Sequence, residues 1–181
     1  MKKFLLTASI LASSLAFSGV AQAVVVASAT LNVSATVAVD CTVTTTAVNF
    51  GNLNATQIST ASGDVSVTCT TGTPYTITLD AGLNLNTTNN LMRHMKNTVD
   101  GVSLAQYHLS ANPASPFAYY SSWGDAGWAG TYPWASGVVT DTSNGVAQPH
   151  PVYGQAIATN ASNQPAPAGA YSDIVNVTVN Y

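Results

Sequence analysis

Apolar and small polar side chains alternate along much of this chain, and the longest such run lies near its beginning. From Val24 to Val43 the sequence reads VVVASATLNVSATVAVDCTV. This period of two predicts an extended strand with one apolar face. At about 3.3 Å per residue the run would be about 65 Å long, whereas strands of a compact sandwich usually have about five or six residues. The run is therefore too long for one strand of one domain.

Shorter alternating runs follow, and turn residues separate them. Strands are expected at residues 47–51, 64–69, 75–79 and 171–181, with weaker signals over 92–107 and 106–110. Residues 111–151 are rich in Pro, Gly, Ser and aromatic side chains, which predicts long loops around short strands. Since no stretch has a helical period, the pattern predicts an all-β fold, an antiparallel sandwich of immunoglobulin-like character.

The first 23 residues have the features of an export signal. Lys2 and Lys3 precede an apolar run from Phe4 to Ala16, and Ala21-Gln22-Ala23 has the small-x-small form of a cleavage site. We expect removal of the signal peptide at residues 1–23. No other stretch approaches the roughly 20 apolar residues of a membrane span, so we expect export through the periplasm without membrane insertion.

Composition excludes several classes of function. Glu is absent, and seven Asp stand against Arg93 and Lys96 once the signal is removed, which gives a formal charge of about −5. So few cations argue against binding to nucleic acid or to an anionic membrane surface. Abundant Val, Thr, Asn and Ser also favour strands over helices.

Cys41 and Cys69 are the two cysteines of the chain. In an exported protein such a pair predicts a disulfide, and closing the loop 41–69 should contribute roughly 3 to 4 kcal/mol in the chain-entropy model. A metal site would need His or further Cys nearby, and none is near in the sequence.

The sequence has no recognisable catalytic motif. The histidines His94, His108 and His150 are scattered, and there is no HExxH, glycine-rich phosphate loop or G-x-S-x-G elbow. We therefore predict no enzymatic activity, no metal and no cofactor. His108 is expected in a strand with a structural or surface role, and His150, between Pro149 and Pro151, is expected in a loop.

Two interpretations of the opening run remain open from the residues alone. The expected disulfide ties the Cys41 end to the chain's own sandwich, whereas the part before it, about 27–37, has no tether. A free apolar stripe invites aggregation unless something receives it, and addition to a sheet edge of a second molecule would do so. The alternative is an ordinary first strand with a bend near Ser34–Thr36.

Motifs along the whole mature chain resemble the spore coat protein U domain, the pilin subunit family of archaic chaperone–usher pili. The motifs lie in family order, and the strongest is the ending PAPAGAYSD followed by alternating valines, together with the paired cysteines. They are residues 39–43, 65–70, 72–75, 79–82, 107–109, 123–125, 152–155 and 165–173.

The resemblance implies an incomplete immunoglobulin-like sandwich that a donor strand from a neighbouring subunit completes. It divides the mature chain into a donor extension, residues 24–37, and a pilin domain, residues 38–181. The donor side chains would be Ala29, Leu31, Val33, Ala35 and Val37. The acceptor groove would be walled by Val175, Val177, Val179 and Tyr181.

The resemblance also implies partners and a location. They are other copies of the chain in an extracellular fibre, a periplasmic chaperone, an outer-membrane usher and a two-domain tip adhesin, with surface adhesion and biofilm formation as the role. A spore-coat or secreted surface protein built by the same strand exchange stays an alternative.

A cluster of aromatic side chains supports a third alternative, a lectin or an adhesive tip or minor subunit. Exposed aromatic faces are typical of sugar-binding and adhesive sites. Trp128 and Trp134 lie outside the family motifs and are the candidates for exposed contacts, whereas Tyr107 and Trp123 are expected to pack inside. The cluster comprises Tyr107, Phe117, Tyr119, Tyr120, Trp123, Trp128, Tyr132 and Trp134.

Overall fold

The computed structural model describes residues 24–85, 92–115, 117, 122–125, 137–160 and 162–181. The chain divides into two compact units, residues 1–36 and 37–181. The described part of the first unit, residues 24–36, is exposed throughout and contains neither helix nor strand. The expected signal peptide, residues 1–23, lies outside the described residues.

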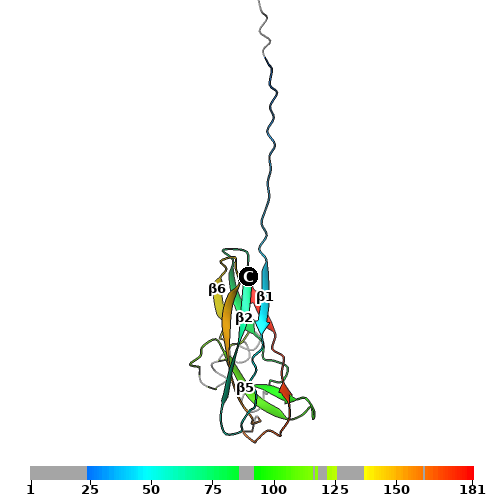
Figure 1. Ribbon diagram of the computed structural model, residues 1–181, viewed down its shortest axis with the longest axis vertical. Helices are drawn as coiled ribbons and strands as arrows, with labels where there is room; N and C mark the ends of the chain where they lie inside the picture. Colours follow the sequence, from blue (N-terminus) through cyan, green and yellow to red (C-terminus); the bar gives the residue numbers. More distant parts are fainter. Residues whose placement is uncertain (1–23, 86–91, 116, 118–121, 126–136, 161) are drawn as a thin grey trace, which may run out of the picture. The chain divides into compact units, whose positions relative to one another are not determined.

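The second unit is built from antiparallel strands in two sheets (Figure 1). The larger sheet has the order β1-β2-β7-β5-β4-β8 and the smaller one the order β6-β3-β9. Its described part contains no helix, so the predicted all-β class is confirmed. The strands are β1 (Cys41–Thr46), β2 (Ser59–Cys69), β3 (Pro74–Leu79), β4 (Arg93–Asn97), β5 (Leu104–Ser110), β6 (Val139–Thr142), β7 (Gln148–Ile157), β8 (Tyr171–Ser172) and β9 (Val177–Asn180).

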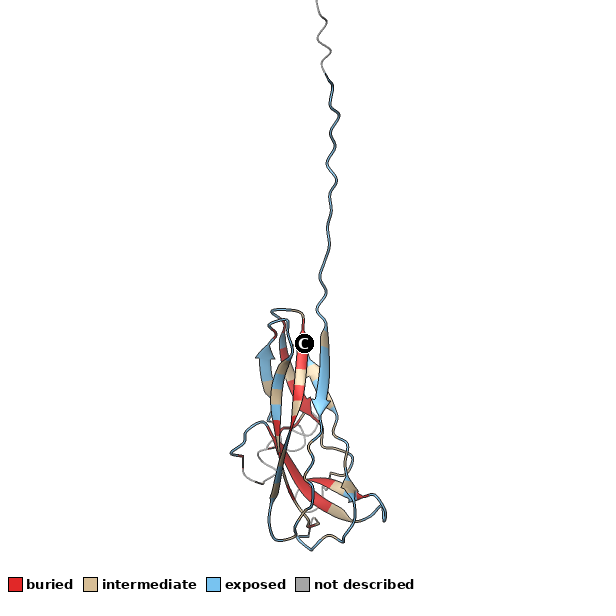
Figure 2. Cartoon of the chain, viewed as in Figure 1, coloured by how far each residue is buried: buried red, intermediate tan, exposed pale blue. Residues whose placement is uncertain are grey.

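The hydrophobic core is formed by side chains from both sheets. Figure 2 colours the buried residues red along the strands. Val65 and Val67 of β2 and Ile77 of β3 are almost fully buried. Because successive side chains of a strand point to opposite faces, every second residue of β2 from Val65 onward reaches the core. Trp123 is buried here as expected, and its indole nitrogen donates to the carbonyl of Ile77 at 2.9 Å.

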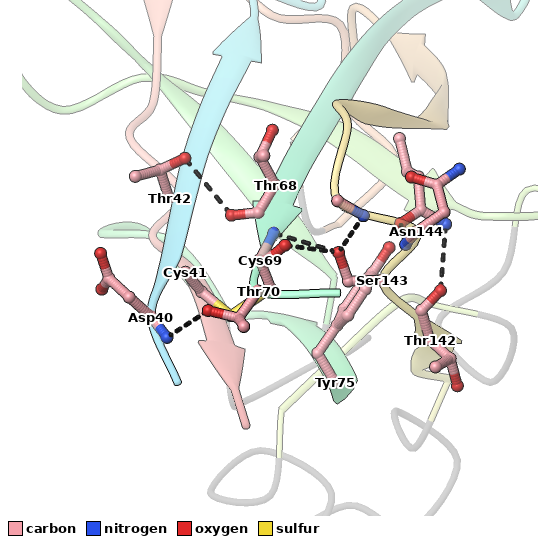
Figure 3. Close-up of a disulfide and its surroundings, with 12 residues drawn as sticks. Asp40, Cys41, Thr42, Thr68, Cys69, Thr70, Tyr75, Thr142, Ser143 and Asn144 are labelled. Carbon is pink, nitrogen blue, oxygen red and sulfur yellow. Dashed lines mark hydrogen bonds between the residues drawn. A yellow bond between two sulfur atoms is a disulfide. The ribbon is translucent and has the colours of Figure 1, made fainter. Parts of the chain in front are cut away.

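The first strand starts only at Cys41, where the expected disulfide with Cys69 is present (Figure 3). The two cysteines are also direct partners in the β1–β2 ladder. Thr70 extends this attachment: its amide donates to the carbonyl of Asp40 at 2.9 Å, and its hydroxyl donates to the carbonyl of Ala38 at 3.2 Å. The chain is thus fixed to the sandwich from about residue 38 onward.

His150 lies in strand β7, so its expected place in a loop is wrong. Pro149 and Pro151 flank it, and proline cannot donate a ladder hydrogen bond. Among the described strands, residues 148–152 of β7 pair with β2 alone, because β5 pairs only with residues 153–157. This part of β7 is effectively an edge, which is where proline is tolerated in a sheet.

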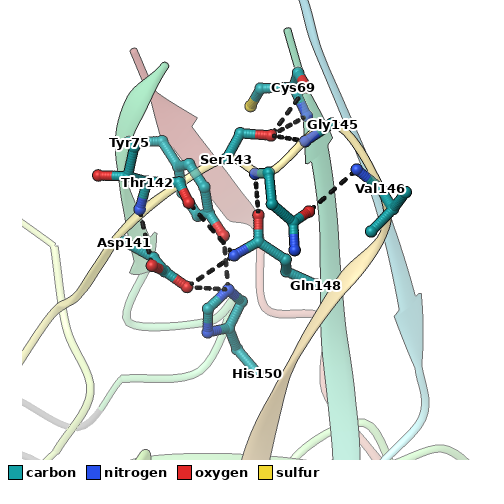
Figure 4. Close-up of polar contacts among 10 residues, drawn as sticks. Cys69, Tyr75, Asp141, Thr142, Ser143, Gly145, Val146, Gln148 and His150 are labelled. Atoms are coloured by element: carbon teal, nitrogen blue, oxygen red, sulfur yellow. Dashed lines mark hydrogen bonds and ion pairs between the residues drawn. The ribbon is translucent and has the colours of Figure 1, made fainter. Parts of the chain in front are cut away.

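His150 also joins the two sheets (Figure 4). Its Nε2 lies 2.8 Å from the hydroxyl of Tyr75 on β3 and 3.9 Å from Asp141 on β6. Gln148 of β7 donates to the Asp141 carboxylate at 3.0 Å. Burial, followed by the Asp141 carboxylate, raises the pKa of Tyr75 above its ordinary value. These polar contacts connect β7 of the larger sheet to β3 and β6 of the smaller sheet, in addition to the apolar packing between the sheets.

The last expected strand, residues 171–181, is two strands in the structure. β8 pairs with β4 in the larger sheet, and β9 pairs with β3 in the smaller one. Residues 173–176 therefore cross from one sheet to the other. Val175, Val177 and Val179 keep the predicted alternation and are half-buried against the core.

Candidate functional site

An apolar groove of about 1310 Å³ borders the hydrophobic core of the second unit. Its floor comes from both sheets, so any segment that lies in it contacts the centre of the sandwich. The floor side chains are Val65, Leu79, Met95, Ala105, Tyr107, Leu109 and Val152.

Two segments wall this groove. The first wall, residues 45–53, continues from β1, and its Val48 and Phe50 pack against the core. It can approach the sheet closely because Gly154 has no side chain: a Cβ there would lie 2.6 Å from Val48 and 2.8 Å from Phe50. The second wall, residues 166–177, includes β8 and the crossing segment.

Edge strands of both sheets lie beside the groove. β1 is at one end of the larger sheet and β9 is at one end of the smaller sheet. Thr45 and Thr46 of β1 and Val177 of β9 line the same groove. Each of these strands pairs on one side only among the described residues, so their outer N–H and C=O groups are available to an added strand.

The structure separates the four predicted acceptor residues. Val175 and Val177 line the groove. Val179 packs against the core but does not line the groove, and Tyr181 is 61% exposed. Their assignment as contacts of a donor strand stays a prediction.

The predicted donor side chains are exposed in the structure. Leu31 is 88% exposed and Val33 is 87% exposed, both in the first unit. Val37, the first residue of the second unit, is exposed too. Trp128 and Trp134, the predicted adhesive contacts, lie outside the described residues.

Asp173 fastens the start of the crossing segment. Its Oδ2 accepts from the hydroxyl of Tyr107 at 2.5 Å, and its Oδ1 accepts from the amide of Leu83 at 3.1 Å and the side chain of Asn84 at 2.9 Å. Gly82, at φ +74°, has no room for a Cβ because the carboxylate occupies that space. One carboxylate thus joins the second wall to β5 and to the loop after β3.

Asp80 fastens the other end of the crossing segment. Its Oδ1 accepts from the amide of Asn176 at 2.9 Å and its Oδ2 from the side chain of Asn176 at 2.6 Å. The amide of Asp80 donates in return to the carbonyl of Asn176 at 3.0 Å. The second wall is therefore held by side chains at both ends of residues 173–176.

A buried arginine lies behind these carboxylates. The guanidinium of Arg93 donates to the carbonyls of Leu79 at 3.2 Å, Asp80 at 3.0 Å and Trp123 at 2.7 Å. Burial lowers its pKa to about 10, although Tyr107 and nearby aspartates oppose that shift, so Arg93 stays a cation at neutral pH. Burial also raises the pKa of Tyr107 far above its ordinary value, and Asp173 adds to this.

Sequence reasoning placed the groove at the first and last strands and missed its floor and its polar supports. Tyr107, Asp80 and Asp173 lie in the motifs that carry the family resemblance, which was the available signal. What the motifs do not show is that residues 66 positions apart, Tyr107 and Asp173, share a hydrogen bond.

Within its described ranges the structure offers nothing for metal chemistry. No group of three or more His, Cys, Asp or Glu side chains could hold an ion there. Nor does any helix in the described part have the length and apolar character to cross a membrane.

The fold is similar to one chain of a known assembly complex. The match is to the crystal structure of the CsuC–CsuE chaperone–tip adhesion subunit pre-assembly complex from archaic chaperone–usher Csu pili of Acinetobacter baumannii. The TM-score is 0.53 and the sequence identity is 21%, over 81% of this chain. The aligned part is 41% of that chain, so this chain spans less than half of its length.

At this identity the likeness shows the fold alone. No curated protein matches the sequence. The Spore Coat Protein U domain, in contrast, matches residues 27–178, a range that begins inside the exposed extension and ends within β9. This match covers most of the sequence, and the chain belongs to the Spore Coat Protein U domain family.

Proposed function

We propose that this protein is a structural subunit of an extracellular chaperone–usher pilus that polymerises by donor-strand complementation. The observation that carries the proposal is the apolar groove, which borders the core and lies beside the edge strands β1 and β9. The occupant is the extension of a second copy, residues 24–37. The extension supplies what the groove and its edges can accept: apolar side chains on one face and backbone groups that are free to pair.

The energetics support a long-lived joint. Burying the side chains of Ala29, Leu31, Val33, Ala35 and Val37 would contribute on the order of 10 kcal/mol. Backbone hydrogen bonds to the two edges would add about 1 kcal/mol each. Ordering the extension offsets part of this gain. A head-to-tail contact of this kind does not close on itself, so it produces a filament.

The proposal includes the assembly partners. Until a second copy arrives, the apolar groove needs cover, which a periplasmic chaperone would supply by lending a strand. An outer-membrane usher would then exchange that strand for the extension of the next subunit. The similar structure is itself a chaperone–subunit complex, which supports a chaperone as a partner. A surface fibre of this kind would serve adhesion and biofilm formation.

The test is a deletion of residues 24–37 that retains the signal at 1–23. Material sheared from producing cells is viewed by electron microscopy and run on SDS gels without boiling. The unmodified chain should give thin fibres and a ladder of multimers that collapses to one band on heating. The deletion variant alone should give neither, because it can accept a strand but cannot donate one.

A matched control shows whether the deletion variant still folds. When the deletion variant is produced together with the full-length chain, it should enter the ladder at one end and shorten it. Fibres from the deletion variant in cells without the full-length chain would refute the donor assignment. A ladder without fibres would favour a coat-like assembly built by the same strand exchange.

A further inference from the structure

We propose that the hydrogen bond between Tyr107 and Asp173 sets the position of the second wall, so that the empty groove is preformed for strand capture. This inference rests on the proposed function, since it concerns how the groove receives a donor strand. It makes Tyr107 and Asp173 positioning residues: the contact acts through the placement of residues 173–177, not through the Asp173 carboxylate touching the incoming strand.

Tyr107 suits this role because it belongs to two parts of the groove at once. Its ring lies in the floor and its centroid is 6.3 Å from that of Phe50 in the first wall. Its hydroxyl donates to Asp173 in the second wall at 2.5 Å. One side chain of the floor therefore contacts both walls. Tyr107 is only 4% exposed, so the surrounding core holds it in place.

The second wall needs such support because its own pairing is short. β8 has two residues, and its ladder with β4 comprises the pairs Lys96 with Ser172 and Asn97 with Tyr171. From residue 173 to residue 176 no strand is formed. Between the two short ladders, the side chains of Asp173 and Asp80 hold this segment, through the contacts described above.

The two carboxylates have different functions in this arrangement. Asp80 binds Asn176 next to β9, so it continues the β3–β9 ladder by local contacts. Asp173 instead connects the segment to β5, a strand of the larger sheet. The Tyr107–Asp173 contact is therefore a polar contact that fixes the start of the crossing segment to the groove floor, beside the apolar packing of Val175. Without it, the wall keeps its ladders at both ends but can shift between them.

Once a donor strand is in place, its ladder with β9 would hold the wall as well. The Tyr107–Asp173 contact should therefore matter for the rate at which the groove captures a strand and little for the rate at which a bound strand leaves. A contact that only stabilised the fold would change both rates, or neither.

The experiment compares the variants Tyr107→Phe, Asp173→Asn and the double variant. Tyr107→Phe keeps the ring in the floor and removes only the hydroxyl. The full chain is unfolded in denaturant and diluted into buffer without chaperone, so that its groove is empty, and an excess of a labelled peptide with the sequence of residues 27–38 is added. Capture is followed by fluorescence anisotropy, and release is followed after addition of unlabelled peptide.

We expect each single variant to capture the peptide about tenfold more slowly, with the release rate changed less than twofold. The double variant should be no slower than either single variant, because partners in one contact are not additive. The control is Tyr153→Phe, the same change on the neighbouring strand β7 at a residue that does not line the groove. It should behave like the unmodified chain.

The outcomes separate this inference from the proposed function. Capture at the unmodified rate by Tyr107→Phe, or additive slowing in the double variant, would overturn the positioning role while leaving strand exchange intact. Failure of the unmodified chain to capture the peptide at all would instead refute the proposed function.

Discussion

His94 shows how a single buried side chain couples the fold to pH. It is fully buried, and its Nδ1 lies 2.8 Å from the carbonyl of Met92. Burial lowers its pKa, and the Met92 carbonyl and the Asp173 carboxylate only partly oppose this. The folded protein therefore favours the neutral imidazole, whereas the unfolded chain binds a proton near the ordinary value of about 6.5.

We predict that stability falls as the pH drops below about 6.5. The folded pKa is lowered, so the contribution of His94 is complete above the unfolded pKa and is lost as the pH falls through the folded one. One such group can contribute a slope of up to about 1.4 kcal/mol per pH unit. Urea unfolding between pH 7.5 and pH 4.5 measures it.

The matched variant for this measurement is His94→Asn, whose amide can still donate to the carbonyl of Met92 but does not titrate. It should lose less stability over the same pH range than the unmodified protein. Equal slopes in the two proteins would show that His94 does not carry the acid sensitivity.

At the scale of elements, the expected donor extension has the sequence pattern of a strand but forms no strand in the structure. Residues 24–36 alternate like a strand, and the structure leaves them exposed and without a strand. Alternation reports which side chains would share a face if the backbone were extended. It does not provide the neighbouring strand, and here the proposed neighbour belongs to another molecule.

A pair of adjacent substitutions tests this segment. Leu31→Asp places a charge among the proposed buried side chains, which should cost several kcal/mol in the joint because a buried charge without a partner is strongly unfavourable. Asn32→Asp adds the same charge to the opposite face and should cost little. The measurement is the temperature at which the multimer ladder collapses on SDS gels.

We expect Leu31→Asp to abolish the ladder or to lower its collapse temperature by tens of degrees, and Asn32→Asp to leave it nearly unchanged. If both substitutions had equal effects, the alternation would not define the buried face of a donor strand.

The same comparison shows how far the sequence determines the elements. The strands at 64–69 and 75–79 carry large apolar side chains with turn residues after them, and their central parts were predicted well. The first half of β2, Ser59–Gly63, has no large apolar side chain and lies between the predicted strands 47–51 and 64–69. It is a strand through its pairing with residues 152–156 of β7.

Long-range pairing explains the other differences as well. Pro149 and Pro151 usually indicate a loop. They are tolerated in β7 because, among the described strands, β5 pairs only with residues 153–157 and leaves the part around the two prolines unpaired on that side. Residues 173–176 cross between β8 and β9, where Tyr107 binds Asp173 and Asp80 binds Asn176. None of these partners is near in the sequence, so no local pattern could indicate them.

On the scale of the whole molecule, two parts of one sequence are complementary: the groove and the extension. The second unit has a groove with a sheet edge from each layer beside it. The first unit contributes an exposed extended segment with an apolar face. Complementary features that pair from one copy of a chain to the next generate open, head-to-tail assemblies when the contact does not close on itself.

The most direct test places a photo-cross-linking amino acid at Val33 and irradiates assembled fibres. Isotopically light and heavy subunits are mixed before assembly, so that mass spectrometry distinguishes links within a chain from links between chains. The account predicts links between a light and a heavy subunit, from position 33 to the groove of the other copy, at residues such as Tyr107, Val152 or Val177. Links confined to one chain, or links between chains that avoid the groove, would contradict it.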